Sequence, residues 1–530
     1  MNLRLSIFVC GLIFISCSNN HELINVKEID SNIFIDSDGV AYFSYKDNNR
    51  YQIYTLQNGS IYPIIQSKRD LFTPFCYKGE ICALYDNFGD EKWKTTSSSL
   101  NRQLHHCYLE RIDSNSDGRF IVFQPKNTNQ LLLLDIENSS ILKIMEFKTR
   151  YHNVVFDERH NRMFISFDDK IIEHNLSTNI TSEILSGTLG EKRNIHQSGD
   201  ILYFNSNDTS EYHHIYKHSL KGNSTHPILV HKGNSDVMMP KIISGDLCFI
   251  QCNRNHYQLK CIRGKEEAII TESGVVYQYS TYDEDQILFS YSDFNLPRSL
   301  MTYNISKREL LNLTGESIPL DLKYEYCEMN DHLSPAYRII PNQQIQGTLL
   351  FFHPGLNSDF SPRWDTIIMS LAQNGYEIIC PNYPMSSGYG KTYNNASFQD
   401  AVYDMIAWKN KILCENNDYP LCLLASSSGN LVMEAVLYSD QRGVDGAISL
   451  FGLYNPRIPM TNISHLIILG KNDPIVDSET RAVQIENSLN KNIRVICFDD
   501  EGHWVRNNRN STQMLDALFI FFETVSFSRD

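Results

Sequence analysis

Residues 421–438, LCLLASSSGNLVMEAVLY, join a short apolar run to a stretch with helical periodicity through a turn of small polar residues. The pattern predicts a buried strand, a sharp turn and a helix. A serine on such a turn stands clear of the backbone and can reach a neighbouring base. Ser427 fits this place best, because Ala425 and Gly429 put small residues two positions before and after it. The alternative is a serine-rich turn without chemistry.

Two more residues follow apolar runs of the same kind: Asp473 in LGKNDPIVD and His503 in DDEGHW. Serine, acid and histidine in this order are typical of α/β-hydrolase catalytic triads. His503 is the only histidine after Asp473 in the sequence, and we expect Asp473 to orient it as the general base. Other carboxylates that could take the place of the acid are Asp477, Asp499 and Asp500. The pattern indicates a serine hydrolase.

The last third of the chain alternates between two kinds of segment. Apolar runs that predict strands are TLLFFH, YEIICP, LCLLA, GAISLF, HLIILG and IRVICF. Amphipathic stretches that predict helices lie at Trp364 to Asn374, Phe398 to Glu415, Asn430 to Gln441, Ser478 to Lys491 and Thr512 to Val525. Alternating strands and helices are typical of a mainly parallel, doubly wound sheet. We expect an α/β-hydrolase catalytic domain at 346–530, preceded by a linker at 321–345.

Residues 22–320 repeat a different unit, in which short apolar strands are separated by polar turns. The first apolar residues of these strands are Ile53, Leu131, Ile171, Ile215, Leu259 and Leu300, so the separations are 78, 40, 44, 44 and 41 residues. The first gap equals two periods, and a hidden unit near 86–96 would bring the count to seven. A period of about 40–45 residues is that of a four-stranded propeller blade. The sequence predicts an all-β propeller of seven blades, with a β-sandwich pair or a β-helix as alternatives.

The length and charge of the chain limit the number of its domains and the kinds of molecule that we expect it to bind. A chain of 530 residues is long enough for two domains, each with its own core. Lys and Arg number 47 against 62 Asp and Glu, and the net charge is −15. Nothing in this balance predicts binding to nucleic acid or to an anionic lipid surface. No motif implies a metal or an organic cofactor, and the oligomeric state is not predicted.

The first seventeen residues, MNLRLSIFVCGLIFISC, place Arg4 before an apolar stretch that is too short to span a bilayer. This pattern predicts a signal peptide. Its end, FISC, resembles the bacterial lipobox, in which Cys17 would be lipidated and become the mature N-terminus. A conventionally cleaved signal or an uncleaved anchor is the alternative. We expect an exported lipoprotein of the bacterial cell envelope, facing the periplasm or the cell surface, that meets the membrane only through its lipid.

The spacing of the cysteines does not indicate a disulfide framework, because the cysteines outside the leader are odd in number and widely scattered. One pair is better placed. In LCFIQCNRNHYQLKCI, residues 247–262, a turn at Asn253 to His256 would set Cys248 opposite Cys261 on adjacent strands. The alternatives are unpaired buried thiols, or a zinc site that adds Cys252 and His256, although the spacing is not that of a zinc finger.

Four motifs resemble the prolyl oligopeptidase family of serine peptidases. They are CPNYPMSSGYGKTYNNA (380–396), ASSSGN (425–430), GKNDPIV (470–476) and DEGH (500–503). The segment YSDFNLPRSLMTYN (291–304) is similar to the last propeller blade of the acylaminoacyl-peptidase and dipeptidyl-peptidase branches. The resemblance covers roughly residues 30–528 and implies a propeller that covers an α/β-hydrolase. The chain departs from the family pattern at Ala425 and Asn430, where the family has glycine.

A tetrahedral oxyanion needs two donors. The backbone N–H of Ser428 is one, by its position after the nucleophile. The loop after TLLFF should supply the other, but Pro354 has no N–H, so Gly355 or a side chain must serve. Some branches of the family use a tyrosine hydroxyl, which Tyr383 or Tyr389 could replace here. The alternative is that both tyrosines are structural.

The resemblance implies short peptides as substrates, cleaved through an acyl-enzyme, with access restricted by the propeller. Only 45 residues separate Ser427 from Asp473, a segment that is longer in the family and helps to line its substrate cleft. The paired glutamates of dipeptidyl-peptidases have no clear counterpart. Two alternatives stay open: a carboxylesterase for acylated sugars or other esters, and a catalytically impaired propeller-containing binding protein.

Overall fold

The computed structural model describes most of the chain after its first 26 residues. The described residues are 27–47, 50–57, 59–85, 92–104, 107–126, 128–147, 151–186, 191–221, 226–330, 333–415, 418–455, 463–478, 480–481, 485 and 492–526. The predicted leader with Cys17 and most of the helix expected at 478–491 lie outside them. Among the helices within these ranges, none is both long and apolar enough to cross a membrane.

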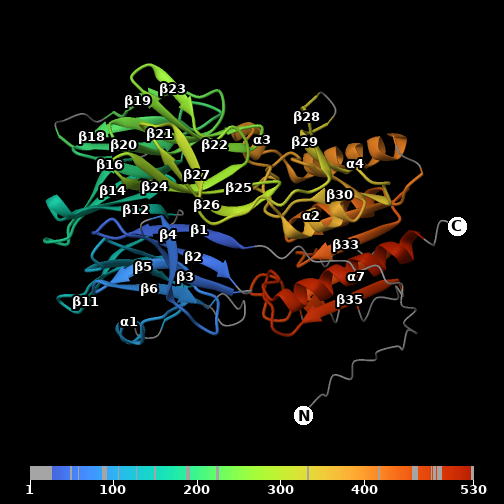
Figure 1. Ribbon diagram of the computed structural model, residues 1–530, viewed down its shortest axis with the longest axis horizontal. Helices are drawn as coiled ribbons and strands as arrows, with labels where there is room; N and C mark the ends of the chain where they lie inside the picture. Colours follow the sequence, from blue (N-terminus) through green and yellow to red (C-terminus); the bar gives the residue numbers. More distant parts are fainter. Residues whose placement is uncertain are drawn as a thin grey trace, which may run out of the picture.

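The described residues before 313 form seven antiparallel blades arranged side by side (Figure 1). Blades 1 and 2 comprise β1 (Glu28–Ile35), β2 (Ala41–Asp47), β3 (Arg50–Gln57) and β4 (Ser60–Ile65), then β5 (Phe72–Tyr77), β6 (Glu80–Tyr85) and β7 (Lys94–Thr95). Blades 3 and 4 comprise β8 (Leu109–Ser114), β9 (Phe120–Pro125), β10 (Gln130–Asp135) and β11 (Ser140–Glu146), then β12 (Tyr151–Asp157), β13 (Arg162–Phe167), β14 (Ile171–Asn175) and β15 (Thr181–Leu185).

The remaining blades continue the same meander. Blade 5 comprises β16 (Lys192–Ser198), β17 (Ile201–Ser206), β18 (His214–Ser219) and β19 (Ile228–His231). Blades 6 and 7 comprise β20 (Val237–Ile243), β21 (Asp246–Asn253), β22 (His256–Arg263) and β23 (Glu266–Ile269), then β24 (Val275–Asp283), β25 (Gln286–Asp293), β26 (Leu296–Asn304) and β27 (Glu309–Asn312). Two short helical elements lie between strands, α1 (Ser98–Gln103) and the 3₁₀ turn η1 (Glu158–His160).

The repeat seen in the sequence is the third strand of each blade. All six marker residues lie in such strands, and each is 0% exposed: Ile53, Leu131, Ile171, Ile215, Leu259 and Leu300. The hidden unit is blade 2, whose short third strand β7 falls within residues 86–96. The prediction of seven blades is therefore confirmed, and the period is visible because this strand is buried in every blade.

The ring closes by side-chain contacts between the first and last blades. Gln278 on β24 accepts a hydrogen bond from the Ile33 N–H at 3.1 Å and donates one to the Ile33 carbonyl at 3.2 Å. Ile29 and Phe43 of blade 1 pack in one cluster with Leu300 of blade 7. A glutamine amide thus extends the hydrogen bonding of β1 across the closure.

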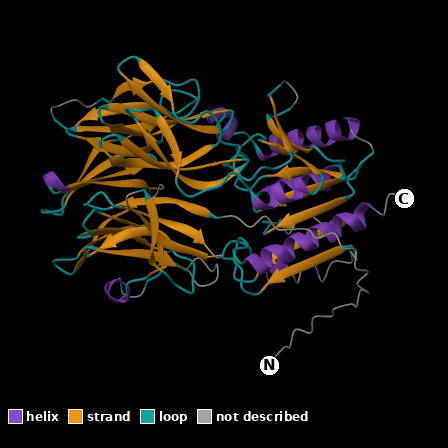
Figure 2. Cartoon of the chain, viewed as in Figure 1, coloured by secondary structure: helices purple, strands orange, loops and turns teal. Residues whose placement is uncertain are grey.

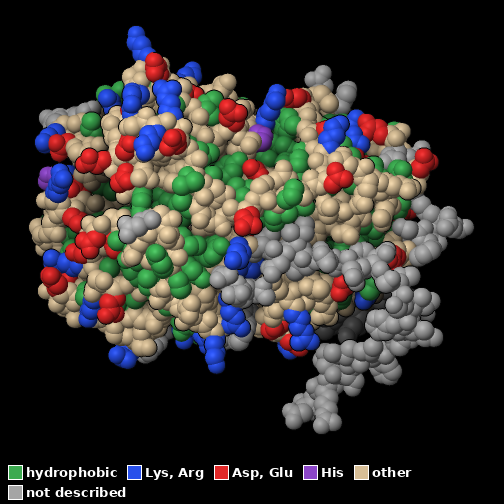
Figure 3. All heavy atoms as spheres, viewed as in Figure 1, with side chains coloured by type: hydrophobic (Ala, Val, Ile, Leu, Met, Phe, Trp, Pro, Cys, Tyr) green, Lys and Arg blue, Asp and Glu red, His purple; other side chains and the backbone are tan. Residues whose placement is uncertain are grey.

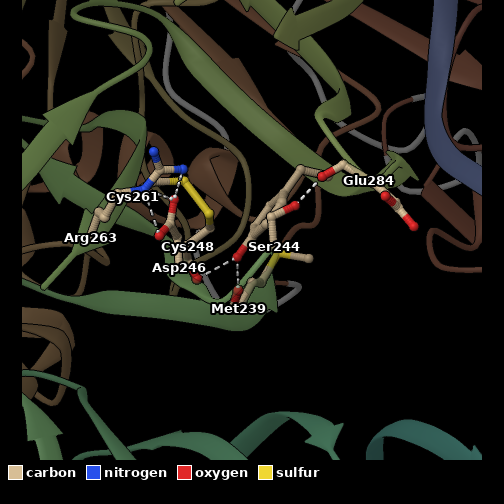
Figure 4. Close-up of a disulfide and its surroundings, with 8 residues drawn as sticks. Met239, Ser244, Asp246, Cys248, Cys261, Arg263 and Glu284 are labelled. Carbon is tan, nitrogen blue, oxygen red and sulfur yellow. Dashed lines mark hydrogen bonds and ion pairs between the residues drawn. A yellow bond between two sulfur atoms is a disulfide. The ribbon is translucent and has the colours of Figure 1, made fainter. Parts of the chain in front are cut away.

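Blade 6 contains the disulfide that the sequence suggested. Cys248 on β21 lies opposite Cys261 on β22, and the two sulfurs are bonded (Figure 4). The connecting turn uses Arg254 and Asn255 at φ of 51° and 58°, as a tight two-residue hairpin turn requires. The disulfide takes two of the four ligands that the zinc alternative needed.

The second domain is an eight-stranded sheet with helices on both faces (Figures 1 and 2). Its strand order is β28 (Leu322–Cys327), β29 (Ala336–Pro341), β31 (Tyr376–Pro381), β30 (Gly347–Phe352), β32 (Leu421–Ser426), β33 (Gly446–Leu450), β34 (Ser464–Gly470) and β35 (Ile493–Phe498). From β31 to β35 neighbouring strands are parallel. The described helices are α2 (Thr366–Gln373), α3 (Lys391–Asn394), α4 (Phe398–Glu415), α5 (Gly429–Ser439) and α7 (Asn508–Ser526).

Two apolar cores flank this sheet. Helices α2 and α7 pack on one face, where Leu349 and Leu518 are buried together. Helices α4 and α5 pack on the other face, where Leu350 meets Met405 and Val432. Neighbouring residues of β30 thus point into different cores, as the alternation of a strand requires. The predicted α/β-hydrolase sheet is confirmed.

The prediction of a linker at 321–345 is wrong. Strands β28 and β29 lie within it and form the antiparallel edge of the hydrolase sheet. The segment lacks a continuous apolar run because edge strands of this kind are buried on only part of their surface, and β28 has no fully buried residue.

A polar contact holds the two domains together. The Asp359 carboxylate of the hydrolase domain accepts hydrogen bonds from Asn255 Nδ2 at 2.8 Å and from the Tyr257 hydroxyl at 3.0 Å, both at the hairpin tip of blade 6. Ser387 Oγ donates to the same carboxylate at 2.9 Å. Asn255 is only 1% exposed.

On the face in Figure 3, acidic and basic side chains are interspersed, without a broad basic area.

We predict that Tyr257→Phe destabilises the protein by ~1–3 kcal/mol, because it leaves the buried Asp359 carboxylate short of one donor. Urea unfolding measures this change. Tyr438→Phe is the matched control, since Tyr438 is 64% exposed. Equal stability of both variants would show that the Tyr257 hydroxyl contributes nothing to the contact between the domains.

Candidate active site

Ser427 lies on a strained turn between β32 and α5. Its φ of 49° is in the left-handed region, which residues other than glycine seldom adopt. The Ser427 N–H donates to the Leu450 carbonyl, and its own carbonyl accepts from the Leu453 N–H, both at 3.0 Å. A Cβ at Gly429 would lie 2.3 Å from the Phe352 carbonyl oxygen, so only glycine lets α5 approach β30 this closely. The turn has the geometry of a nucleophile elbow.

The structure brings the three residues predicted from the sequence into one hydrogen-bonded chain. Ser427 Oγ lies 2.8 Å from His503 Nε2, and His503 Nδ1 lies 2.8 Å from Asp473 Oδ2. An ionised carboxylate can only accept, so Nδ1 donates to Asp473 and Nε2 is left to accept from the Ser427 hydroxyl. The side chains of His503 and Asp473 are 3% and 0% exposed.

Asp473 is held by its own turn. Its second carboxylate oxygen, Oδ1, accepts from the N–H groups of Ile475 at 2.8 Å and Val476 at 2.9 Å. One oxygen therefore fixes the carboxylate on the backbone while the other faces His503. The alternative acids are engaged elsewhere: Asp477 accepts from Thr480, Asp499 pairs with Lys471, and Asp500 accepts from Asn510.

Glu501 shapes the loop that carries His503, a role that the sequence analysis missed. Its side chain is 2% exposed and accepts from the backbone N–H groups of Arg506 and Asn507 at 3.0 and 2.9 Å. It also accepts from Asn510 Nδ2 at 2.8 Å. Burial raises the pKa of this carboxyl group above its ordinary value. Only its place two residues before His503 could have drawn attention to it.

The two departures from the family pattern are accommodated by their neighbours. Ala425 is fully buried in the core under α5. Asn430 is also fully buried, and its Nδ2 donates to the Leu453 carbonyl at 2.7 Å. The amide lies against Gly452, where a Cβ would stand 2.6 Å from Asn430 Cγ. The larger side chain at 430 is therefore matched by a glycine at 452, and the elbow keeps its shape.

The oxyanion donors differ from expectation in one respect. The N–H of Ser428 has no hydrogen-bond partner within the described ranges. The Gly355 N–H does have one, because it donates to the Ser428 hydroxyl at 2.7 Å. Gly355 has a φ of 75°, and the preceding residue is Pro354, which has no N–H.

The two tyrosines proposed as substitute donors are bound elsewhere. Tyr383 is fully buried, and its hydroxyl donates to the His353 carbonyl at 2.8 Å. Its ring stacks on the His353 ring at a centroid distance of 4.4 Å. The Tyr389 hydroxyl accepts from Asn382 Nδ2 at 3.0 Å. Both tyrosines therefore take the structural alternative.

Two cavities lie between the domains, and the smaller one lies beside the triad. One, of about 250 Å³, is lined by Phe451 and Trp504 beside the triad and by Glu28 and Lys46 of blade 1. The other, of about 750 Å³, is lined by blade residues such as Glu191 and His213 and by hydrolase residues such as Asn357 and Lys391. The rings of Phe451 and Trp504 both contact His503 edge-on. Neither aromatic residue was singled out from the sequence.

Comparison with solved structures shows the same arrangement of domains in known enzymes. A puromycin-hydrolyzing peptidase from Mycobacterium tuberculosis superposes with a TM-score of 0.76 at 14% identity, and the match covers 94% of each chain. A prolyl endopeptidase superposes with a TM-score of 0.78 at 12% identity, covering 96% of this chain and 90% of the other. The chain has the prolyl oligopeptidase fold. 

This prolyl oligopeptidase fold also superposes on the acylaminoacyl peptidase from Pyrococcus horikoshii, with a TM-score of 0.68 at 13% identity over 94% of this chain and 95% of the other. Neither the protein families nor the curated proteins compared with the sequence gave a match. At these identities the likeness establishes the fold alone.

Two buried histidines behind the site make stability sensitive to acid. Burial lowers the pKa of His353 from 6.5 to about 4 and that of His465 from 6.5 to about 3. Between roughly pH 6.5 and pH 4 the unfolded chain therefore binds protons that the folded chain does not. The free energy of unfolding must then fall as the pH is lowered through this window.

We predict that His465→Gln flattens this dependence by ~1.4 kcal/mol per pH unit for the one proton removed. The measurement is urea unfolding at several pH values, read as a slope and not as a level, since the variant also loses a buried hydrogen bond to Ser449. Ser439→Ala, at an exposed serine that does not titrate, should leave the slope unchanged. A slope in His465→Gln equal to that of the wild type would contradict the lowered pKa of His465.

Proposed function

We propose that this protein is a serine peptidase that hydrolyses short peptides through an acyl-enzyme intermediate on Ser427. The observation that carries the proposal is the hydrogen-bonded chain from Ser427 through His503 to Asp473, with the serine on a strained elbow. Strain of this kind at a polar residue persists only where the surrounding structure enforces it, and it is common at active sites. The fold shared with solved peptidases agrees with this chemistry.

The geometry gives each residue a role. Nε2 of His503 takes the Ser427 proton while Oγ attacks the peptide carbonyl, and Asp473 stabilises the imidazolium that forms. The oxyanion forms beside the Ser428 N–H. His503 then gives the proton to the leaving amine, which departs as the acyl-enzyme forms. Water repeats the sequence, with His503 again as base, and releases the acid and the free Ser427 hydroxyl.

The propeller supports a restriction to small substrates. Residues of blade 1 line the smaller cavity together with residues that surround His503. This cavity has a volume of about 250 Å³, and Phe451 and Trp504 give it an apolar wall. A folded protein is too large to enter such a space, whereas a side chain of a short peptide is not.

The test is labelling with a fluorophosphonate, followed by mass spectrometry of the modified peptide. We expect one label on Ser427 and none on Ser427→Ala, whose peptidase activity should fall by about 10³-fold or more. Ser426→Ala is the matched control, because Ser426 lies next to Ser427 but has no hydrogen bond to His503 among those of the described residues. Absence of label on the folded wild-type protein would favour the binding-protein alternative.

Matched peptide amides and esters then separate peptidase from carboxylesterase. The triad serves both reactions, but an amide nitrogen must be protonated as it leaves, so only a peptidase turns over the amide well. We expect hydrolysis of short peptide amides at rates within the usual range for enzymes. Turnover of esters alone would establish the esterase.

We also propose that the enzyme is exported and tethered to the cell envelope through a lipid on Cys17. The support is the sequence pattern of residues 1–17. The full-length protein should partition into the detergent phase when expressed in a bacterium, and Cys17→Ala should move it to the aqueous phase or leave it as an unprocessed precursor. Identical partitioning of both proteins would refute the anchor.

A further inference from the structure

The hydroxyl of Ser428 occupies an unusual place in this site. Ser428 follows the nucleophile and is 8% exposed. Its Oγ accepts the hydrogen bond from the Gly355 N–H at 2.7 Å. In the part of the chain that the structure describes, the Ser428 O–H has no acceptor for its own proton. A buried hydroxyl with a fixed oxygen and a free proton therefore stands beside the Ser427 turn.

Other donors near the nucleophile are already used. Pro354 has no N–H, and the N–H of Gly355 points at Ser428 Oγ. The His353 ring nitrogens lie 3.2 Å from the Pro354 carbonyl and 2.8 Å from Ser386 Oγ. The hydroxyls of Tyr383 and Tyr389 have the partners described above. Ser428, which directly follows the nucleophile, has two donors without a partner among the described residues: its backbone N–H and its hydroxyl.

We propose that Ser428 supplies both oxyanion donors, the second through its side-chain O–H, and that Gly355 orients this hydroxyl instead of binding the oxyanion itself. The inference rests on the proposed hydrolase function. The Gly355 N–H fixes the position of Oγ, so the hydroxyl proton is confined to the remaining directions around that oxygen. A hydroxyl that accepts one hydrogen bond is polarised and becomes a better donor to the next.

The position of the Ser428 hydroxyl suits it to stabilise the negative charge that develops on the substrate oxygen. The hydroxyl is buried, so its hydrogen bond to an oxyanion forms in a medium of low dielectric constant. Among the described residues the hydroxyl has no acceptor, so it gives up no hydrogen bond to these residues when it donates to the oxyanion. Such a donor acts on the transition state more than on the ground state and should affect kcat more than KM.

The test uses Ser428→Ala and Ser428→Thr in the full folded protein, assayed with a peptide amide. We expect Ala to lower kcat roughly 10²–10³-fold with little change in KM, as removal of one oxyanion donor does. Thr keeps the hydroxyl and should retain most of the activity that Ala loses. Ser439→Ala is the matched control, since Ser439 is an exposed serine at the end of the same helix.

A second readout separates donation from a structural role. A peptidyl aldehyde forms an adduct that carries the oxyanion, whereas the cleaved peptide acid does not. We expect Ser428→Ala to weaken aldehyde inhibition by a factor similar to its loss of kcat while product inhibition changes little. If Ser428→Ala does not fold, Ser428→Cys keeps the size with a weaker donor and should show a smaller loss of the same kind.

The proposal is overturned if Ser428→Ala is as active as wild type or more active. That result would mean that the hydroxyl blocks the hole and that Gly355 is the second donor once it is freed. Failure of the proposed function would look different, because the wild-type protein itself would then neither hydrolyse peptides nor react with a fluorophosphonate at Ser427.

Discussion

The close approach of α5 to the end of β30 is the constraint on which the rest of the site depends. A side chain at Gly429 would collide with the Phe352 carbonyl, so the turn between β32 and α5 is as tight as a polypeptide allows. The tightness holds Ser427 in the left-handed region and directs its hydroxyl at His503. The same approach places the Ser428 side chain against the Gly355 N–H. The nucleophile and the oxyanion site are therefore two results of one packing contact.

Polar groups attach the propeller to the hydrolase domain. Such an interface excludes water from the site while each domain keeps its own apolar core. Asp359 takes its three hydrogen bonds from two domains, and the hairpin tip of blade 6 is buried against the hydrolase loops. The disulfide between Cys248 and Cys261 joins the two strands of that hairpin to each other. A rigid hairpin can carry a buried amide such as Asn255 into the other domain, because the amide arrives already oriented. The cavities between the domains are bounded by this arrangement.

Much of this architecture could be predicted because it depends on patterns within short stretches of the sequence. The third blade strands are buried in every repeat, so their period survives in the sequence, and α4 begins and ends where its amphipathic stretch does. The triad followed from chain order and motif. Much of what was missed depends on contacts between distant segments: the edge strands β28 and β29, the pairing of Asn430 with Gly452, and the bond between Gly355 and Ser428. No single stretch of sequence contains both partners of such contacts.

The most direct test of the account is a search for the acyl-enzyme itself. Purified protein lacking residues 1–17 would be mixed with a p-nitrophenyl ester of a short N-blocked peptide, quenched in acid at successive times, and analysed by intact-protein and peptide mass spectrometry. We expect a burst of nitrophenol equal to the enzyme concentration and an acyl group on Ser427. Hydrolysis without a burst and without an acyl group at any time, or an acyl group on another residue, would contradict it.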